Sequence, residues 1–286
     1  MLKHAHTYRR LILPPALAIS LLFAFVPAAL VATHAQSPSL HLFGPKQHYL
    51  ALGDSLAFGF QPCQLTPPVP ASCSPMNGYV YDLFNTLKSE GTKDVTDLGC
   101  PSETSTTFIH GGCPSSPSTP AQLTTAMTFL QAHPGKVSPV TLDIGASDMV
   151  PDLIGCTVSP NFATDLATLD TNLKYILSQL KTALMVNGQV TGSIVMMNYY
   201  NPFPNCLATP NAQQFTQDFT AFNTVLATDV NGCGCGTIVD VFDAFGGITT
   251  PNLCTYTWIC AVGDIHPMNL GYSVIANTFA AAIPPD

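Results

Sequence analysis

Residues 53–59 hold a serine, Ser55, in a place where a hydroxyl could do chemistry. The apolar run of residues 49–52 predicts a short buried strand that ends at Gly53 and presents Ser55 at the rim of a sheet. In open α/β sheets, ligands bind at the carboxyl ends of the strands. A serine there could attack an acyl carbon. However, an Asp-Ser pair is also a common helix cap, and this is the more frequent role of the motif in isolation.

Three further stretches of the sequence decide between these interpretations. They are residues 97–104 (Asp-Leu-Gly-Cys-Pro-Ser-Glu-Thr), residues 143–148 (Asp-Ile-Gly-Ala-Ser-Asp) and residues 264–267 (Asp-Ile-His-Pro). Together with residues 53–59, and in this order, they resemble the sequence blocks of the GDSL, or SGNH, family of serine hydrolases. The resemblance covers nearly all of the chain after residue 35. It implies one domain, residues 36–286, with a flavodoxin-like SGNH hydrolase fold.

The resemblance also implies three catalytic roles, with Ser55 as nucleophile, His266 as base and Asp264 as the group that orients the base. His266 stands directly before a C-terminal amphipathic segment, whereas the other histidines after residue 35 lie in less suitable places: His41, His48, His110 and His133. Asp264 precedes His266 by two residues, where the family commonly has three. Asp264 could therefore be only a turn residue, with a backbone carbonyl of residues 258–263 holding the imidazole.

Donors for an oxyanion are the remaining requirement. The resemblance implies the backbone N–H groups of Ser55 and Gly99. The family's third donor is an asparagine side chain, but here Ser147 takes its place. A hydroxyl can donate one hydrogen bond, so we expect an active enzyme with Ser147 as donor, or with a water filling the gap. Ser147 is also the first alternative nucleophile.

No metal and no cofactor is predicted, because Asp54 and Asp148 each adjoin a motif residue and are expected to bind loop backbone. The Gly-x-Ser-x-Gly elbow of α/β-hydrolases does not occur in the sequence. No pair of carboxylates stands out as the catalytic pair of a glycosidase. The resemblance therefore implies an esterase or lipase that acts on small-molecule or lipid esters. The alternatives are a carbohydrate acetylesterase and a non-catalytic binding protein that has kept the fold.

Residues 1–35 have the pattern of an export signal, with a basic start, an apolar run over residues 11–31 and a small-residue cleavage site before Gln36. An uncleaved anchor is the competing interpretation, which the prolines in the run disfavour. Without this segment, which has three basic residues and no acidic ones, the net charge changes from −8 to −11 and no arginine remains. This charge argues against nucleic-acid binding and favours neutral substrates. We expect a secreted, extracellular monomer with no stable membrane insertion.

All ten cysteines lie after residue 35, and an even number in an exported chain predicts disulfides. The predicted pairs are Cys63–Cys73, Cys100–Cys113, Cys254–Cys260 and Cys156–Cys206. We find no basis for pairing Cys233 with Cys235, because so short a loop would be strained.

Apolar strand patterns alternate with helical patterns, which predicts a three-layer α/β/α sandwich around a five-stranded parallel sheet. The predicted strands are residues 48–52, 95–98, 140–144, 193–197 and 237–241. The predicted helices are residues 80–89, 121–132, 161–184, 212–230 and about 270–280. Two proline-rich stretches, residues 62–75 and 114–120, are predicted loops beside the substrate cleft.

Overall fold

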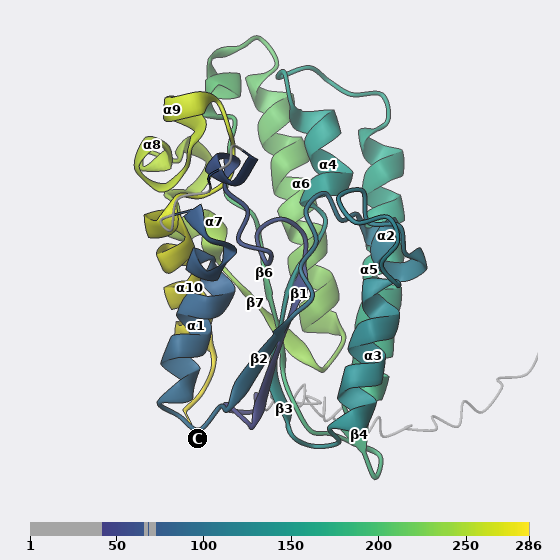
Figure 1. Cartoon of the computed structure of the whole chain (residues 1–286). Helices are drawn as coiled ribbons and strands as arrows, with labels where there is room; N and C mark the ends of the chain where they lie inside the picture. The colour runs from purple at the N-terminus through teal and green to yellow at the C-terminus, as the bar shows by residue number, and fades with distance from the viewer. Residues whose placement is uncertain (1–41, 66–67, 69–72, 286) are drawn as a thin grey trace, which may run out of the picture. The chain divides into compact units, whose positions relative to one another are not determined.

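Five short segments pair into one parallel sheet with the strand order β2-β1-β3-β6-β7 (Figure 1). The strands are β1 (His48–Gly53), β2 (Asp94–Asp97), β3 (Val137–Asp143), β6 (Ile194–Met197) and β7 (Gly236–Val239). This is the strand order of flavodoxin-like doubly wound folds. The structure, a computed structural model, describes residues 42–65, 68 and 73–285. The predicted signal segment and its cleavage site lie outside the described residues.

The burial of each strand follows its place in the sheet. β1, β3 and β6 lie inside the sheet and are almost wholly buried, as expected for strands covered on both faces. β2 and β7 are the edge strands, and both are partly exposed. All five predicted strands are confirmed. β3 begins at Val137, three residues earlier than predicted.

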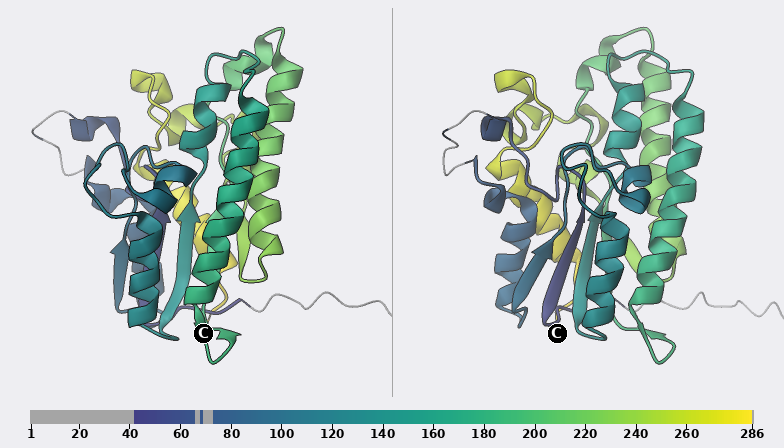
Figure 2. Two further views of the ribbon diagram at one scale, coloured as in Figure 1. Left: turned by 90° about the vertical axis from the view of Figure 1, so that its right-hand side faces the viewer. Right: turned by 45° about the vertical axis from the view of Figure 1, so that its right-hand side comes forward.

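Helices cover both faces of the sheet (Figure 2). One face carries α1 (Tyr79–Lys88) and α10 (Asn269–Ala282), which pack against each other. The other face carries α3 (Gln122–Ala132), α5 (Phe162–Ala183) and α6 (Ala212–Gly232). The predicted three-layer sandwich and its five helices are therefore confirmed. None of the helices that the structure describes is both long enough and apolar enough to cross a membrane.

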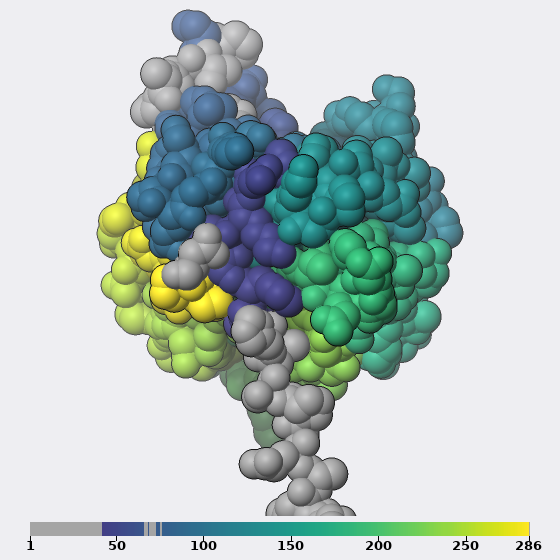
Figure 3. Space-filling model, turned by 90° about the horizontal axis from the view of Figure 1, so that it is seen from below, coloured from purple at the N-terminus to yellow at the C-terminus, as the bar shows by residue number. Residues whose placement is uncertain are grey.

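β1 lies inside the sheet, where it pairs with both β2 and β3. From below, the first described residues (purple) lie between the segment around α1 and β2 (blue) and the segment around α3 and β3 (teal) (Figure 3). The carboxyl end of β1, which leads to Ser55, therefore lies between the carboxyl ends of β2 and β3.

Several short elements were not predicted from the sequence. They are the helices α2 (Ser105–His110), α4 (Ala146–Leu153), α7 (Val241–Ala244), α8 (Leu253–Tyr256) and α9 (Ile259–Val262), the hairpin β4 (Met185–Val186) and β5 (Gln189–Val190), and the 3₁₀ turns η1 (Pro62–Leu65), η3 (Pro75–Asn77), η4 (Pro204–Ala208) and η5 (Gly247–Thr249). Such short elements show no helical period, and α4 even contains Pro151. Local contacts hold them instead. At the start of α2, for example, Thr104 and Thr107 form a reciprocal capping box.

Five disulfides are present, and four of them are the predicted pairs: Cys63–Cys73, Cys100–Cys113, Cys156–Cys206 and Cys254–Cys260. The fifth, Cys233–Cys235, is a pair for which we found no basis in the sequence. Gly234 between them has φ +63°, a left-handed conformation that costs glycine little. The two Cα atoms lie 5.3 Å apart, within the usual range for a disulfide.

Candidate active site

Ser55, His266 and Asp264 form one chain of hydrogen bonds across the carboxyl end of the sheet. Oγ of Ser55 lies 2.8 Å from Nε2 of His266, and Nδ1 of His266 lies 2.8 Å from Oδ1 of Asp264. The same carboxylate oxygen accepts the backbone N–H of His266 at 2.9 Å. The two-residue spacing therefore lets one oxygen atom hold both the ring and the backbone of His266. Neither ring nitrogen is held by a carbonyl of residues 258–263.

The pKa of Asp264 is consistent with its contact with His266. Burial by itself would raise the pKa of Asp264, but the side-chain and backbone hydrogen bonds from His266 outweigh it and leave the pKa below its usual value. Both side chains are partly open to solvent, with 21% of His266 and 26% of Asp264 exposed. Asp264 is therefore ionised at neutral pH and faces the ring of His266 as a carboxylate.

The loop that carries His266 is fixed on several sides. The hydroxyl of Tyr200 donates to the carbonyl of Ile265 at 2.7 Å, and the N–H of Trp258 donates to the carbonyl of His266 at 3.0 Å. The ring of Phe60 meets the imidazole edge to face, with 4.6 Å between the centroids. These contacts set the position of the imidazole independently of Ser55.

The turn before Ser55 depends on Gly53. Its φ is +147°, and a Cβ added there would lie 2.2 Å from the carbonyl oxygen of Asp143, so only glycine fits. The amide of Gln122, at the start of α3, holds the peptide groups of Gly53 from both sides. Its Oε1 accepts the N–H of Gly53 at 2.6 Å, and its Nε2 donates to the carbonyl at 3.0 Å. The backbone is thereby fixed immediately before the Asp54–Ser55 turn.

Two buried carboxyl groups, those of Asp54 and Asp143, lie under the Ser55 loop. Asp54 accepts the N–H of Leu56 at 2.9 Å and the hydroxyl of Tyr199 at 2.8 Å. Asp143 accepts the N–H of Asp54 at 2.9 Å and the hydroxyl of Tyr79 at 2.5 Å. Burial raises the pKa of both groups, and the charge of Asp54 raises the pKa of Asp143 further. Asp54 thus binds loop backbone, as predicted.

Three serines supply donors at the mouth of the site. Ser55, Ser102 and Ser147 line one cavity of about 490 Å³, together with His266 and Phe60. Within the described part of the chain, the N–H groups of Ser55 and Ser102 and the hydroxyl of Ser147 donate to no acceptor. These three groups are therefore available to a bound molecule.

Gly99, which we predicted to be an oxyanion donor, has its N–H group engaged by another residue. Its N–H donates to Oδ1 of Asp97 at 2.9 Å, and it lines a separate cavity of about 620 Å³ that does not include Ser55. A Cβ on Gly99 would lie 2.4 Å from the backbone nitrogen of Phe58, so close packing accounts for glycine there. Ser102 has φ +68°, an uncommon conformation for a residue other than glycine. Sequence reasoning missed Ser102, because this backbone conformation leaves no signal in the residue type.

Comparison with known proteins shows which solved structures share this architecture. No protein-family model matches the sequence, and no curated protein sequence matches it either. Among solved structures, the lipase Lip_vut3 from a goat rumen metagenome aligns with a TM-score of 0.59 at 16% identity, over 82% of this chain and 96% of that one. A protein from Parabacteroides merdae assigned as a GDSL-like lipase aligns with a TM-score of 0.55 at 16% identity, over 86% and 99%. This chain has the SGNH hydrolase fold.

A third structure with this fold is Axe2, an acetylxylan esterase from Geobacillus stearothermophilus, with a TM-score of 0.52 at 17% identity, over 86% of this chain and 98% of that one. In this chain, residues 143–148 run from the last residue of β3 into the first turn of α4. Asp148 accepts the N–H of Ser105 at 2.9 Å and its hydroxyl at 2.6 Å. Burial raises the pKa of Asp148. The carboxyl group therefore ties α4 to α2, as expected for a loop-binding role.

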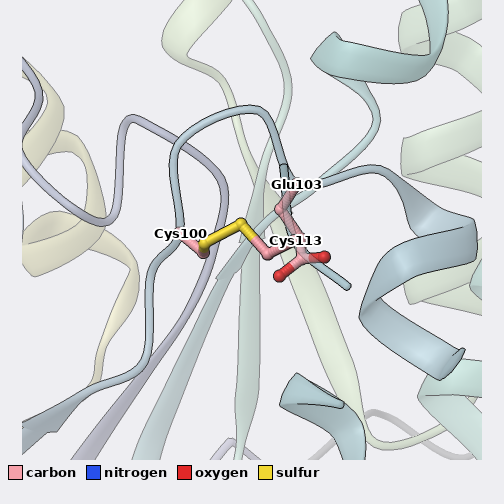
Figure 4. A group of neighbouring side chains, drawn as sticks. All are labelled: Cys100, Glu103 and Cys113. Atoms are coloured by element: carbon pink, nitrogen blue, oxygen red, sulfur yellow. A yellow bond between two sulfur atoms is a disulfide. The ribbon is translucent and has the colours of Figure 1, made fainter. Parts of the chain in front are cut away.

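One group of side chains within the described residues has the composition of a metal site. Cys100 and Glu103, in the loop between β2 and α2, lie close to Cys113, in the loop after α2 (Figure 4). The two sulfur atoms are joined in a disulfide and cannot act as thiolate ligands. This group therefore does not form a metal site.

Proposed function

We propose that the protein is a serine esterase that hydrolyses neutral carboxylic esters through an acyl-enzyme on Ser55. The observation that carries the proposal is the chain of hydrogen bonds from Ser55 through His266 to Asp264, with 2.8 Å at each step. A nucleophile, a base within hydrogen-bond reach and a group that orients the base are what acyl transfer requires.

In the proposed reaction, Oγ of Ser55 attacks the acyl carbon while Nε2 of His266 takes its proton. The tetrahedral intermediate collapses, the bond to the leaving oxygen breaks, and His266 returns the proton to the departing alcohol. A water molecule, deprotonated by His266, then attacks the acyl-enzyme and releases the carboxylic acid. Asp264 keeps Nδ1 protonated and stabilises the imidazolium that forms twice in the cycle.

For the oxyanion we propose the backbone N–H groups of Ser55 and Ser102 and the hydroxyl of Ser147. All three residues line the cavity that holds the nucleophile, and none of the three groups is engaged by another described residue. The amide of Gly99 is a weaker candidate, because it already donates to Asp97. Donors placed in advance where charge develops are usually the largest contribution to such catalysis.

We further propose that the protein acts outside the cell as a domain of residues 36–286, and as a monomer. The signal-like composition of residues 1–35 and the five disulfides support export. The negative charge of the chain supports neutral rather than anionic substrates.

The test is the hydrolysis of p-nitrophenyl acetate by the purified protein and by Ser55→Ala. We expect turnover by the wild type and only a trace in the variant, with the melting temperature nearly unchanged, because one partly exposed hydroxyl contributes little to folding. Incubation with a fluorophosphonate should label Ser55, as peptide mapping by mass spectrometry would show. Full activity of Ser55→Ala, or labelling of Ser147 instead, would overturn this choice of nucleophile.

A further inference from the structure

A second and much smaller cavity lies directly behind Ser55. Its volume is about 50 Å³, and it shares Ser55, His266, Ala146, Val150 and Ile265 with the outer cavity of about 490 Å³. Apart from Asp54, its remaining walls are apolar or aromatic. The inner cavity is therefore an extension of the reaction centre into the core.

The walls of the inner cavity are held firmly. Tyr199 and Tyr200 are almost fully buried, and their hydroxyl groups are already bonded to Asp54 and to the carbonyl of Ile265. The ring of Tyr199 stacks on Phe222, and Phe219 meets Phe222 edge to face. The polar atoms of these walls are thus in use, so the tyrosines and phenylalanines offer a ligand mainly apolar surface.

The direction of the reaction decides which part of an ester enters this cavity. After Ser55 has attacked, the alcohol must depart and water must take its place while the acyl group stays bound. A departing alcohol needs the open side, which the larger outer cavity provides. The acyl tail, which remains on Ser55, is therefore the part that fits the enclosed side.

The volume then limits the length of the tail. A water-sized group occupies about 30 Å³ in a liquid, so the inner cavity accommodates roughly two such groups. The methyl of an acetyl group fits, and so does the ethyl of a propionyl group, whereas an octanoyl tail does not.

We propose that the inner cavity makes the protein selective for esters of very short acids, acetic and propionic, and excludes the long acyl chains of lipids. The inference rests on the proposed esterase function and narrows it to one substrate class. An added methylene in a closed apolar pocket changes specificity by about 10–200-fold. We therefore expect kcat/KM to fall at least about tenfold between propionate and butyrate esters, and to stay low for longer chains.

The experiment compares p-nitrophenyl acetate, propionate, butyrate and octanoate, so that the leaving group stays constant. Phe219→Ala should enlarge the inner cavity and raise the octanoate-to-acetate ratio of kcat/KM by about tenfold or more. Phe108→Ala is the control, because Phe108 on α2 is also buried and is absent from the cavity wall. Leu153→Ala, which opens the same cavity from α4, serves if Phe219→Ala fails to fold.

The outcomes separate the two proposals. Equal or faster wild-type turnover of octanoate, or an unchanged ratio in both Phe219→Ala and Leu153→Ala, overturns the short-acyl selectivity and leaves the esterase function intact. A wild type that hydrolyses none of the four esters faster than Ser55→Ala refutes the esterase function, and the selectivity with it.

Discussion

One oxygen atom, Oδ1 of Asp264, holds both the ring and the backbone of His266. A carboxylate two residues before the histidine can do this because the turn brings the side chain back over its own loop. The departure from the common family spacing therefore does not remove a carboxylate from the imidazole. It changes how the carboxylate reaches the imidazole.

At the residue scale, this contact makes Asp264 testable. Asp264→Asn should lower kcat by at least about two orders of magnitude, and by as much as about 10⁴, because the amide favours the wrong tautomer of His266. KM and the melting temperature should change little. Asp243→Asn, an exposed change on α7, is the control. A loss below tenfold in steady-state kinetics would remove Asp264 from the catalytic machinery and leave a Ser55–His266 dyad.

Ser147 offers a second test at this scale. If its hydroxyl donates to the oxyanion, Ser147→Ala should lower kcat, by up to about 10²–10³ as for other single donors. Ser147→Asn should keep or raise kcat, since an amide reaches further. Both are measured with the same chromogenic ester. An unchanged kcat in Ser147→Ala would show that the hydroxyl does not act on the oxyanion.

Side-chain positions could be predicted from the sequence better than backbone donors. Ser55, His266 and Asp264 stand next to recognisable patterns, and the structure brings them together. Whether a backbone N–H group is free to bind an oxyanion depends on φ and on the acceptors nearby. Asp97 engages the N–H of Gly99, and a left-handed turn leaves that of Ser102 unpaired. Neither fact can be read from residue type.

At the element scale, the junction of β1 with the Ser55 loop is the point least tolerant of change. Gly53→Ala should lower the free energy of unfolding by more than about 2 kcal/mol, because the new Cβ would overlap the carbonyl oxygen of Asp143. Gly112→Ala is a matched control, since Gly112 also has positive φ but has open space around it. It should cost only about 1 kcal/mol. Urea unfolding measures both, and equal losses would mean that φ, not the clash, accounts for Gly53.

Long elements could be predicted from the sequence, whereas short ones could not. The strands and the long helices have apolar periods that extend over several residues, so their positions follow from the sequence. α2 and α4 are too short for a period and depend on contacts from elsewhere, such as the bond from Ser105 to Asp148. The Cys233–Cys235 bridge depends on a single left-handed glycine.

For the molecule as a whole, raised carboxyl pKa values set the pH dependence of stability. Burial raises the pKa of Asp97 to about 7, well above the value of about 3.9 in an unfolded chain. The folded state then binds this proton more tightly, so the contribution of Asp97 to the free energy of unfolding is largest below about pH 4 and is lost as the pH rises through 7. Asp97→Asn should flatten this slope between about pH 4 and 7, which are the unfolded and folded pKa values.

Trp258, the single tryptophan, provides the fluorescence signal for urea unfolding at each pH. Asp243→Asn should keep the wild-type slope, because Asp243 is exposed. Parallel slopes for the wild type and Asp97→Asn would contradict the assignment to Asp97.

The nucleophile follows the first strand, and its base precedes the last helix, 211 residues later. α10 holds this closing segment in place by packing on α1, with Ser273 donating to Asp82 at 2.7 Å and Tyr272 donating to the carbonyl of Phe60 at 2.6 Å. A chain still being synthesised therefore carries Ser55 for most of its elongation with no imidazole to activate it. Under the proposed mechanism hydrolysis requires the segment that carries His266, so we expect forms of the chain truncated before this segment to be inert toward esters.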